Sequence, residues 1–376
     1  MTMSTDWVDL ARRWVPRDLR YAIQRHVSFS EVKRRYFARC DPLSEVTESD
    51  INRYGSPVKV GILKSRVQRH THYVRACQEM GVPFQVVDIA HPNWLEYVID
   101  SGCQLFLVWP DASLGPYARL FKDRCKLLEH DLGLAVFPSF VESWMYEDKI
   151  RTCDWLRAHH IPHPRTWVFF EVHQAKDFAR QCALPIVFKT RFGAAATGVQ
   201  IIRTRRALQR IVKQSFGNGH VPAGHDKRDR EWGSLLLQEY LPEIREWRMV
   251  RIGDSYFGHL KGRAGDFHSG SGQVDWEPPG RRQLEMLHHI TEAAGFRSMD
   301  VDMFETADGT LLVNELQTVF GASVSIDQLR LDGTPGRMAR DPEGEWHFDP
   351  GDFARNACAN ERLRYALEHF SHERIC

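Results

Sequence analysis

Leu184-Pro-Ile-Val-Phe-Lys-Thr-Arg-Phe-Gly-Ala-Ala-Ala-Thr-Gly-Val-Gln-Ile-Ile202 is the stretch that decides the fold. A β-branched and aromatic run ends on Lys189, small residues follow from Gly193 to Gly198, and a second β-branched run closes the stretch. This pattern predicts a hairpin with a small-residue tip. Small side chains let backbone N–H groups approach an anion, and the lysine reaches the same anion as a point charge. The stretch therefore predicts a nucleotide-phosphate site, and an ordinary glycine-containing hairpin is the equally compatible alternative.

Two common phosphate-binding motifs are absent from this stretch. A phosphate loop that ends in Gly-Lys-Ser/Thr opens a helix, whereas here the lysine precedes the loop and a strand follows it. The G-x-G-x-x-G pattern of dinucleotide-binding turns is also missing. Any nucleotide site at this hairpin is therefore of a different kind.

Composition limits the class of protein. A chain of 376 residues with 43% hydrophobic and 26% charged residues is an ordinary globular protein of roughly two to three domains. The net charge of +1 gives no overall attraction to nucleic acid, which is not expected as a partner. Eight cysteines without a C-x-x-C pair are expected to be free thiols, and a zinc site is not expected. No apolar run reaches the roughly 20 residues of a membrane span, and no signal peptide is apparent, so a cytoplasmic location is expected.

Residues 1–55 differ from the rest of the chain, because tryptophan and aliphatic residues recur there at helical spacing among arginines. The pattern predicts a pair of basic amphipathic helices interrupted at Pro16. Such helices pack on their own domain, or they lie on an anionic membrane surface or an acidic protein. We favour packing by about two to one and keep a weak contact through residues 1–40 as the alternative.

Residues 56–140 alternate short β-branched runs with helical patterns. Strands at 58–63, 84–89 and 104–109 and a short one at 136–138 predict a doubly wound parallel sheet with helices on both faces. No glycine fingerprint follows the first strand, so a dinucleotide site is not expected. The ends of these strands suit an acceptor substrate instead.

Residues 141–325 mix helices with antiparallel strands. Helices are expected at 144–160, 207–216 and 281–294, a strand at 235–241, and a hairpin around Gly253-Asp254. The remaining residues, 326–376, are expected to form a tail that ends in a helix at 353–372 and packs on the core. The fold class is thus α/β followed by α+β.

Asp302 and Glu315 lie on two predicted strands joined by a tight turn, 299–304 and 311–316. Their side chains can point to one face and share a divalent cation, and carboxylate oxygens suit Mg²⁺, with Mn²⁺ as a substitute. Taken alone, solvated strand-edge charges explain these acids better.

The order of these parts resembles the ATP-grasp superfamily, in the character of its ribosomal-protein glutamate ligase and D-alanine:D-alanine ligase branches. The resemblance covers roughly residues 56–325. It implies a pre-ATP-grasp domain at 56–140 and an ATP-grasp domain at 141–325, divided into subdomain A at about 141–236 and subdomain B at about 237–325. It also implies an ATP held between those subdomains.

The resemblance implies a role for each matching residue. Lys149 and Lys189 match the lysines that hold the α- and β-phosphates, and the loop that closes over the phosphates comprises Gly193, Ala194, Ala195, Ala196, Thr197 and Gly198. The adenine-reading hinge comprises Gln238, Glu239, Tyr240 and Leu241, and Glu246 matches the acid that holds the ribose. The catalytic side chains implied are Arg248, Lys261 and Arg263, and the metal ligands are Asp302, Glu315 and Gln317.

Two positions depart from the family pattern. The family has an asparagine two residues after the metal-binding glutamate, whereas here Gln317 keeps the amide oxygen on a longer side chain. In the D-alanine ligase branch an arginine lies two residues before the aspartate, whereas here the position is Asp300, which argues against that substrate.

The activity implied is ATP-dependent formation of an amide from a small-molecule carboxylate and an amine through an acyl phosphate. An amino acid, a short peptide or a sugar acid is the expected substrate. Phosphotransfer to a hydroxyl is the first alternative, and a nucleotide-responsive binding protein without turnover is the second. A homodimer stays open beside a monomer.

Overall fold

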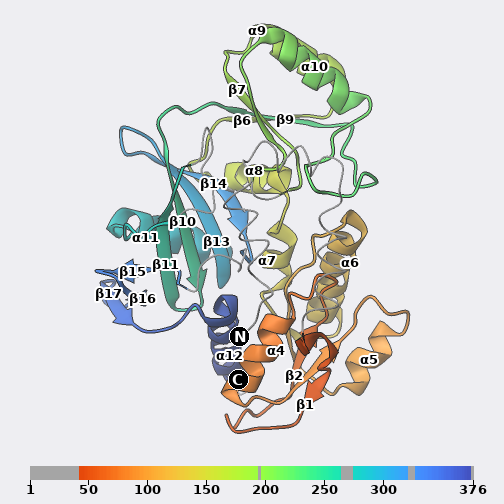
Figure 1. Cartoon of the computed structure of the whole chain (residues 1–376), viewed down its shortest axis with the longest axis vertical. Helices are drawn as coiled ribbons and strands as arrows, with labels where there is room; N and C mark the ends of the chain where they lie inside the picture. Colours follow the sequence, from red (N-terminus) through yellow and green to blue (C-terminus); the bar gives the residue numbers. More distant parts are fainter. Residues whose placement is uncertain (1–41, 194–195, 264–273, 321–326, 374–376) are drawn as a thin grey trace.

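The structure is a computed structural model that describes residues 42–193, 196–263, 274–320 and 327–373. Three sheets make up the fold: a mostly parallel one near the N-terminus, a small antiparallel one, and a large antiparallel one (Figure 1). This mixed architecture confirms the predicted fold class. The predicted N-terminal helices fall mostly within residues 1–41 and lie outside the described residues.

The first sheet has the strand order β1-β3-β2-β4-β5. Strands β2 to β5 are parallel, and only β1 runs antiparallel to its neighbour β3. Its strands are β1 (Glu48–Ser49), β2 (Val60–Leu63), β3 (Phe84–Val87), β4 (Leu105–Leu107) and β5 (Ala135–Phe137). Its helical segments are η1 (Pro42–Glu45), α4 (Thr71–Met80), α5 (Trp94–Asp100), α6 (Gly115–Lys126) and η2 (Leu127–Asp131). Gly81 ends α4 in the left-handed conformation that glycine adopts readily.

The helix predicted at 144–160 is wrong, because the structure has two helices there. They are α7 (Phe140–Met145) and α8 (Lys149–Ala158). The chain is extended at Tyr146 and left-handed at Glu147, with φ of 54°. Asp148 then caps α8 by accepting from the backbone N–H of Arg151 at 3.1 Å. Lys149 therefore begins a helix instead of lying inside one.

The small sheet has the order β6-β9-β7-β8 and is antiparallel throughout. Its elements are β6 (Thr166–Phe169), α9 (Val172–Gln181), β7 (Ile186–Lys189), β8 (Val199–Ile202), α10 (Arg205–Phe216) and β9 (Leu235–Glu239). The pairing of β7 with β8 confirms the predicted hairpin. Ile186 and Phe188 point into a core shared with Leu208 and Val212 of α10, while the hairpin tip lies outside this core.

The large sheet has the order β14-β13-β10-β11-β16-β15, with β12 beside β11 and β17 beside β16. Its strands are β10 (Arg245–Ile252), β11 (Ser255–Lys261), β12 (Val274–Asp275), β13 (Ser298–Glu305), β14 (Leu311–Gln317), β15 (Arg330–Leu331), β16 (Thr334–Arg340) and β17 (Trp346–Pro350). Helix α11 (Arg281–Ala294) packs Leu284, Leu287 and Ile290 into one core cluster with Met249 and Val301 of the sheet.

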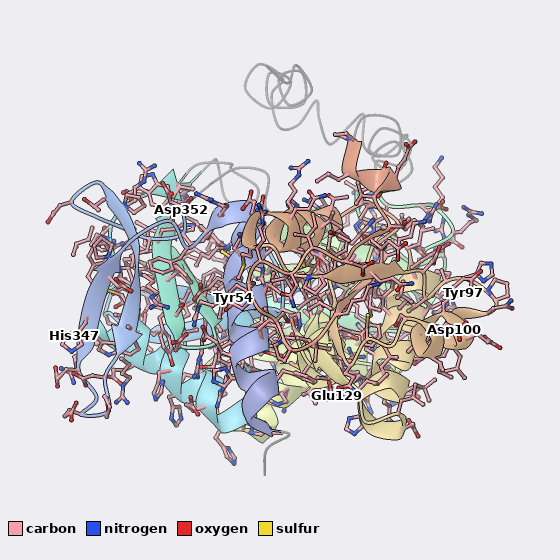
Figure 2. All side chains as sticks on the ribbon, turned by 90° about the horizontal axis from the view of Figure 1, so that it is seen from below. Tyr54, Tyr97, Asp100, Glu129, His347 and Asp352 are labelled. Carbon is pink, nitrogen blue, oxygen red and sulfur yellow. The ribbon has the colours of Figure 1, made fainter. Side chains whose placement is uncertain are left out.

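The C-terminal residues are not only helical, which corrects the predicted helical tail. Strands β15 to β17 extend the large sheet, and α12 (Arg355–Glu373) follows them. Helix α12 lies beside α4, between the first sheet and the large sheet (Figure 1), and packs Leu363, Ala366 and Leu367 into the core that β2 and α4 share. Figure 2 shows His347 of β17 at one end of the molecule and Tyr97 of α5 at the other. The C-terminal segment thus joins two sheets.

Glu142 of α7 ties the first sheet's helices to the large sheet. Its carboxylate is almost fully buried and caps α7 by accepting from Ser139 N at 2.7 Å. It also accepts from Arg297 N at 2.6 Å and from Ser298 N, which begins β13. Burial raises the pKa of Glu142, although these N–H donors favour the ionised form.

We expect Glu142→Ala to lower the free energy of unfolding by about 3 kcal/mol, because it leaves buried backbone N–H groups without an acceptor. Glu142→Gln keeps an acceptor oxygen and is expected to cost less than half as much. Urea unfolding followed by circular dichroism measures both variants. Equal losses for alanine and glutamine would contradict an acceptor role.

Among the residues that the structure describes, every helix is too short or too polar to cross a lipid bilayer.

Candidate active site

Lys149, the first residue of α8, lies between the hairpin of the small sheet and strand β14 of the large sheet. Its Nζ donates to Gly193 O at 2.6 Å and lies 3.0 Å from Glu315 Oε1. Its backbone N–H donates to Arg191 O at 2.9 Å. Burial alone would lower the pKa of Lys149, but Glu315 and Glu147 together raise it. The ammonium group is therefore held charged and in a fixed position.

Lys189 ends β7 and donates from Nζ to Asn314 Oδ1 at 2.7 Å. Burial lowers its pKa to about 8 in spite of the nearby Glu315, and the charge of Lys149 acts in the same direction. Lys149 and Lys189 line one cleft together with Glu315. The two predicted phosphate-binding lysines therefore converge from different elements.

Asn314 is a residue of this cleft that the sequence analysis missed. Asp302 pairs with Glu315 and Met303 pairs with Val313, so Asn314 is an extra residue in the β13–β14 ladder. A β-bulge places two residues of one strand opposite one residue of the other. For this reason Asn314 and Glu315 both line the cleft although they are neighbours in sequence. Simple strand alternation, the signal available from sequence, assigns them to opposite faces.

Three predicted metal ligands meet on the β13–β14 ladder. Asp302 pairs with Glu315, Asp300 pairs with Gln317, and Gln317 Nε2 donates to Glu315 Oε1 at 2.7 Å. Within the described ranges, no group of three or more His, Cys, Asp or Glu side chains is arranged to hold a metal ion. However, Asp302 Oδ1 and Gln317 Oε1 are buried oxygens without a hydrogen-bond donor among the described residues. These oxygens suit Mg²⁺, which completes its shell with water and phosphate oxygens.

A row of alternating charges lies beneath these ligands. Lys261 Nζ contacts Glu246 Oε1 at 2.8 Å and also Asp302 Oδ2. Arg248 Nε lies 3.2 Å from Asp300 Oδ2 and 3.6 Å from Asp302 Oδ1. Burial opposes ionisation of Asp302, but Lys261 and Arg248 hold its pKa below the usual range. Burial raises the pKa of Asp300, which has Asp302 as a like-charged neighbour.

The predicted adenine hinge lines the same cleft. The four hinge residues Gln238, Glu239, Tyr240 and Leu241 line it, as do Glu246 and Arg263. Gln238 Nε2 donates to Thr166 Oγ1 at 3.1 Å, and the Glu239 carboxylate accepts from Arg165 Nε at 2.7 Å. The backbone N–H of Glu239 donates to Arg165 O at 2.9 Å, so strand β6 and the residue before it hold the first part of the hinge in place.

The predicted phosphate loop is only partly in the cleft. Gly193 and Ala196 line it, whereas Ala194 and Ala195 lie outside the described residues. Thr197 and Gly198 do not line it, and Gly198 O accepts from Thr190 N at 2.9 Å. Arg248 and Lys261 also lie behind the cleft wall instead of on its surface. The structure therefore brings the two lysines, the hinge, Glu246, Arg263 and Glu315 to the cleft. The predicted residues within the described ranges that do not line it are Thr197, Gly198, Arg248, Lys261, Asp302 and Gln317.

A larger cavity of about 820 Å³ adjoins the cleft, and Gly193 lines both. Its walls come from Trp109 after β4, from α6, from the start of α8 and from residues 222–231. The sequence analysis placed an acceptor at the strand ends of the first sheet but named none of these residues. These residues lie in five separate parts of the chain, so no local sequence motif contains them all.

Two facing sheets with two lysines, a strand hinge and a carboxylate lining one cleft are the arrangement expected of an ATP-grasp domain. Residues 146–332 match the model of the RimK-like ATP-grasp domain, so this part of the chain is an ATP-grasp domain.

Comparisons with individual proteins agree with this family. The chain is 30% identical over 146 residues to a phosphoribosylamine–glycine ligase of Yersinia pestis, which covers 36% of this chain and 34% of the relative. A homologue from Escherichia coli is 27% identical over 197 residues, which cover 50% of this chain and 44% of the relative. The chain thus spans less than half the length of the curated relatives that it matches.

A solved structure shares the fold at low sequence identity. The RimK domain protein ATP-grasp from Sphaerobacter thermophilus superposes with a TM-score of 0.53 at 16% identity, over 82% of this chain and 98% of that one. This likeness bears on the fold alone.

Lys189 makes nucleotide affinity depend on pH. Only the protonated amine attracts a phosphate, so its charge is present below about pH 8 and is lost as the pH rises through its pKa. We expect the affinity for Mg-ADP to fall by up to about tenfold between ~pH 7 and ~pH 9.5. Calorimetric titrations across this range measure the slope. Lys189→Arg stays protonated and is the control, and a wild-type affinity that is flat over this range would contradict the assignment of Lys189.

Proposed function

We propose that this protein is an ATP-dependent ligase that joins a carboxylate to an amine through an acyl phosphate. The observation that carries the proposal is that Lys149, Lys189 and Glu315 line the same cleft as the strand hinge at residues 238–241. The name of the Yersinia pestis relative, a ligase that joins phosphoribosylamine to glycine, supports this class of reaction.

In this proposal the nucleotide spans the cleft. The hinge backbone from Gln238 to Leu241 binds the adenine edge, Glu246 binds the ribose, and the two lysines bind the phosphates. The cleft holds about 110 Å³, less than the roughly 300 Å³ of a typical ligand pocket. Nucleotide entry therefore requires the small sheet to move away from the large one, as in other lids that close on a substrate.

The oxygen atoms of Asp302, Glu315 and Gln317 would hold Mg²⁺, because Asp302 Oδ1 and Gln317 Oε1 are buried acceptors without a donor among the described residues. The ion supplies charge neutralisation of the phosphates. Lys261 and Arg248, which ion-pair with Asp302, keep that carboxylate ionised and in position. In this proposal they act through Asp302, and Arg263, which faces the cleft, is the arginine that contacts the acyl phosphate.

The reaction balances as two displacements. A substrate carboxylate oxygen attacks the γ-phosphorus, the bond to the β-phosphate oxygen breaks, and ADP leaves. The amine nitrogen then attacks the acyl carbon and loses a proton, and inorganic phosphate leaves as the amide forms. Lys149 and Lys189 stabilise the charge that develops on the phosphoryl oxygens.

Calorimetric titration of ATP with Mg²⁺ tests the nucleotide site. We expect wild-type protein to bind and Lys189→Ala to bind at least about tenfold more weakly, because a charge-assisted contact to phosphate is lost. Glu315→Ala is expected to bind with little dependence on Mg²⁺. Lys176→Ala, on the exposed face of α9, is the matched control. If the wild type does not bind ATP, the proposal is wrong.

Hydroxylamine distinguishes the proposed ligase from its alternatives. Incubated with ATP, Mg²⁺, hydroxylamine and a panel of amino acids, short peptides and sugar acids, the protein is expected to release ADP and to form a hydroxamate from an acyl phosphate. ADP release without hydroxamate, with a phosphorylated hydroxyl in the product, would identify a phosphotransferase. Binding of ATP without ADP release over the whole panel would favour a binding protein without turnover.

A further inference from the structure

The 820 Å³ cavity lies beside the proposed nucleotide site, which does not use it. It lies at the carboxyl ends of the first sheet, where Trp109 follows β4, and it reaches α6 on one side and α8 on another. Gly193 belongs to the walls of both the cavity and the nucleotide cleft. A molecule in the cavity can therefore contact the same glycine that lines the cleft beside Lys149 and Lys189.

One wall of the cavity is formed by residues 222–231, which precede β9 of the small sheet. Asp229 Oδ2 accepts from the backbone N–H of Gly115, the first residue of α6, at 2.8 Å. Leu114, the N-cap of α6, offers no side-chain cap, so Asp229 caps this helix from 114 residues away in sequence. Residues 222–231 and α6 thus form one continuous wall.

The carboxylates of the cavity are all engaged by protein groups. Asp148 pairs with Arg191 at 2.7 Å and with Arg151 at 3.2 Å. Backbone N–H groups of Arg191, Phe192 and Gly193 bind two of the other acids. The five acids that line the cavity and have such partners are Glu147, Asp148, Asp226, Asp229 and Glu231.

Three cations of the cavity, Arg119, Lys122 and Arg230, are in no ion pair with a carboxylate among the described residues, and two of them lie together on α6. Arg119 and Lys122 lie one turn apart on the face of α6 that lines the cavity. Among the described residues, no carboxylate lies within ion-pair distance of either; Lys122 Nζ donates only to a carbonyl, Tyr146 O, at 3.0 Å. Burial and the nearby Arg151 lower the pKa of Lys122 to about 8. A bound anion would stabilise the charged form of the Lys122 ammonium group.

We infer that this cavity binds the co-substrate of the proposed ligase, and that this co-substrate carries an anionic group, a carboxylate or a phosphate, held by Lys122 and Arg119. The inference rests on the proposed function. The reacting group of the co-substrate then lies near Gly193 and Lys149, and its anionic group lies against α6.

Anion binding to the nucleotide-loaded protein tests the inference. The full chain is saturated with Mg²⁺ and β,γ-methylene ATP, which fills the phosphate end of the cleft, and is titrated by calorimetry with inorganic phosphate and, separately, with succinate. We expect at least one of these anions to bind to the wild type, and we expect Arg119→Ala/Lys122→Ala to bind it at least about tenfold more weakly. The anion that binds more tightly identifies the group as phosphate or carboxylate.

Lys126→Ala removes a lysine of α6 that does not line the cavity, and is expected to leave anion binding unchanged. Thermal unfolding of the double variant, whose two side chains contact water, is expected to match the wild type. The inference is wrong if the double variant binds the anions as tightly as the wild type does. It is also wrong if the wild type binds the ATP analogue but neither anion. If the wild type does not bind the ATP analogue, the proposed function is wrong instead.

Discussion

The position of Lys149 is the constraint on which the candidate site depends. A buried ammonium group is tolerated only where opposite charge and hydrogen-bond acceptors surround it. Glu315 of the large sheet and Gly193 O of the small-sheet hairpin meet this requirement, and the backbone N–H of Lys149 binds Arg191 O. One residue therefore holds the start of α8 against both sheets. The contacts that neutralise the charge of Lys149 thus also join the two sheets beside the cleft.

The same demand explains the row of charges on the large sheet. Glu246, Lys261, Asp302, Arg248 and Asp300 alternate in sign, so each cation lies next to a carboxylate. Three carboxylates face two cations, and burial together with the charge of Asp302 raises the pKa of Asp300. Carboxylates buried together without enough positive charge are unfavourable, and the neutral form of Asp300 relieves this. Glu246 and Asp302 are then the two carboxylates that balance Lys261 and Arg248.

Local periodicity explains which parts of this fold could be predicted from sequence. The hairpin at Lys189 and the strand-helix alternation of the first sheet are local patterns, and the structure has both. The break between α7 and α8 occurs at Tyr146 and Glu147, which carry no glycine or proline signal. Strand β16, rich in glycine, proline and arginine, is half-buried and lacks a clear alternation. The bulge at Asn314 depends on the partner strand, which a local pattern does not contain.

Contacts between distant segments escape sequence reasoning for the same reason, and Gly193 illustrates it. Its place in a small-residue loop was apparent, but its place between two cavities depends on residue 222 and α8 coming together in the fold. Its φ of 111° disfavours any other residue, and a Cβ there would lie 3.2 Å from Pro222 Cβ and from Thr197 Oγ1. A side chain would therefore strain the backbone and narrow the junction where nucleotide and co-substrate are proposed to meet. The backbone conformation at position 193 and the space needed for the proposed reaction thus both require glycine.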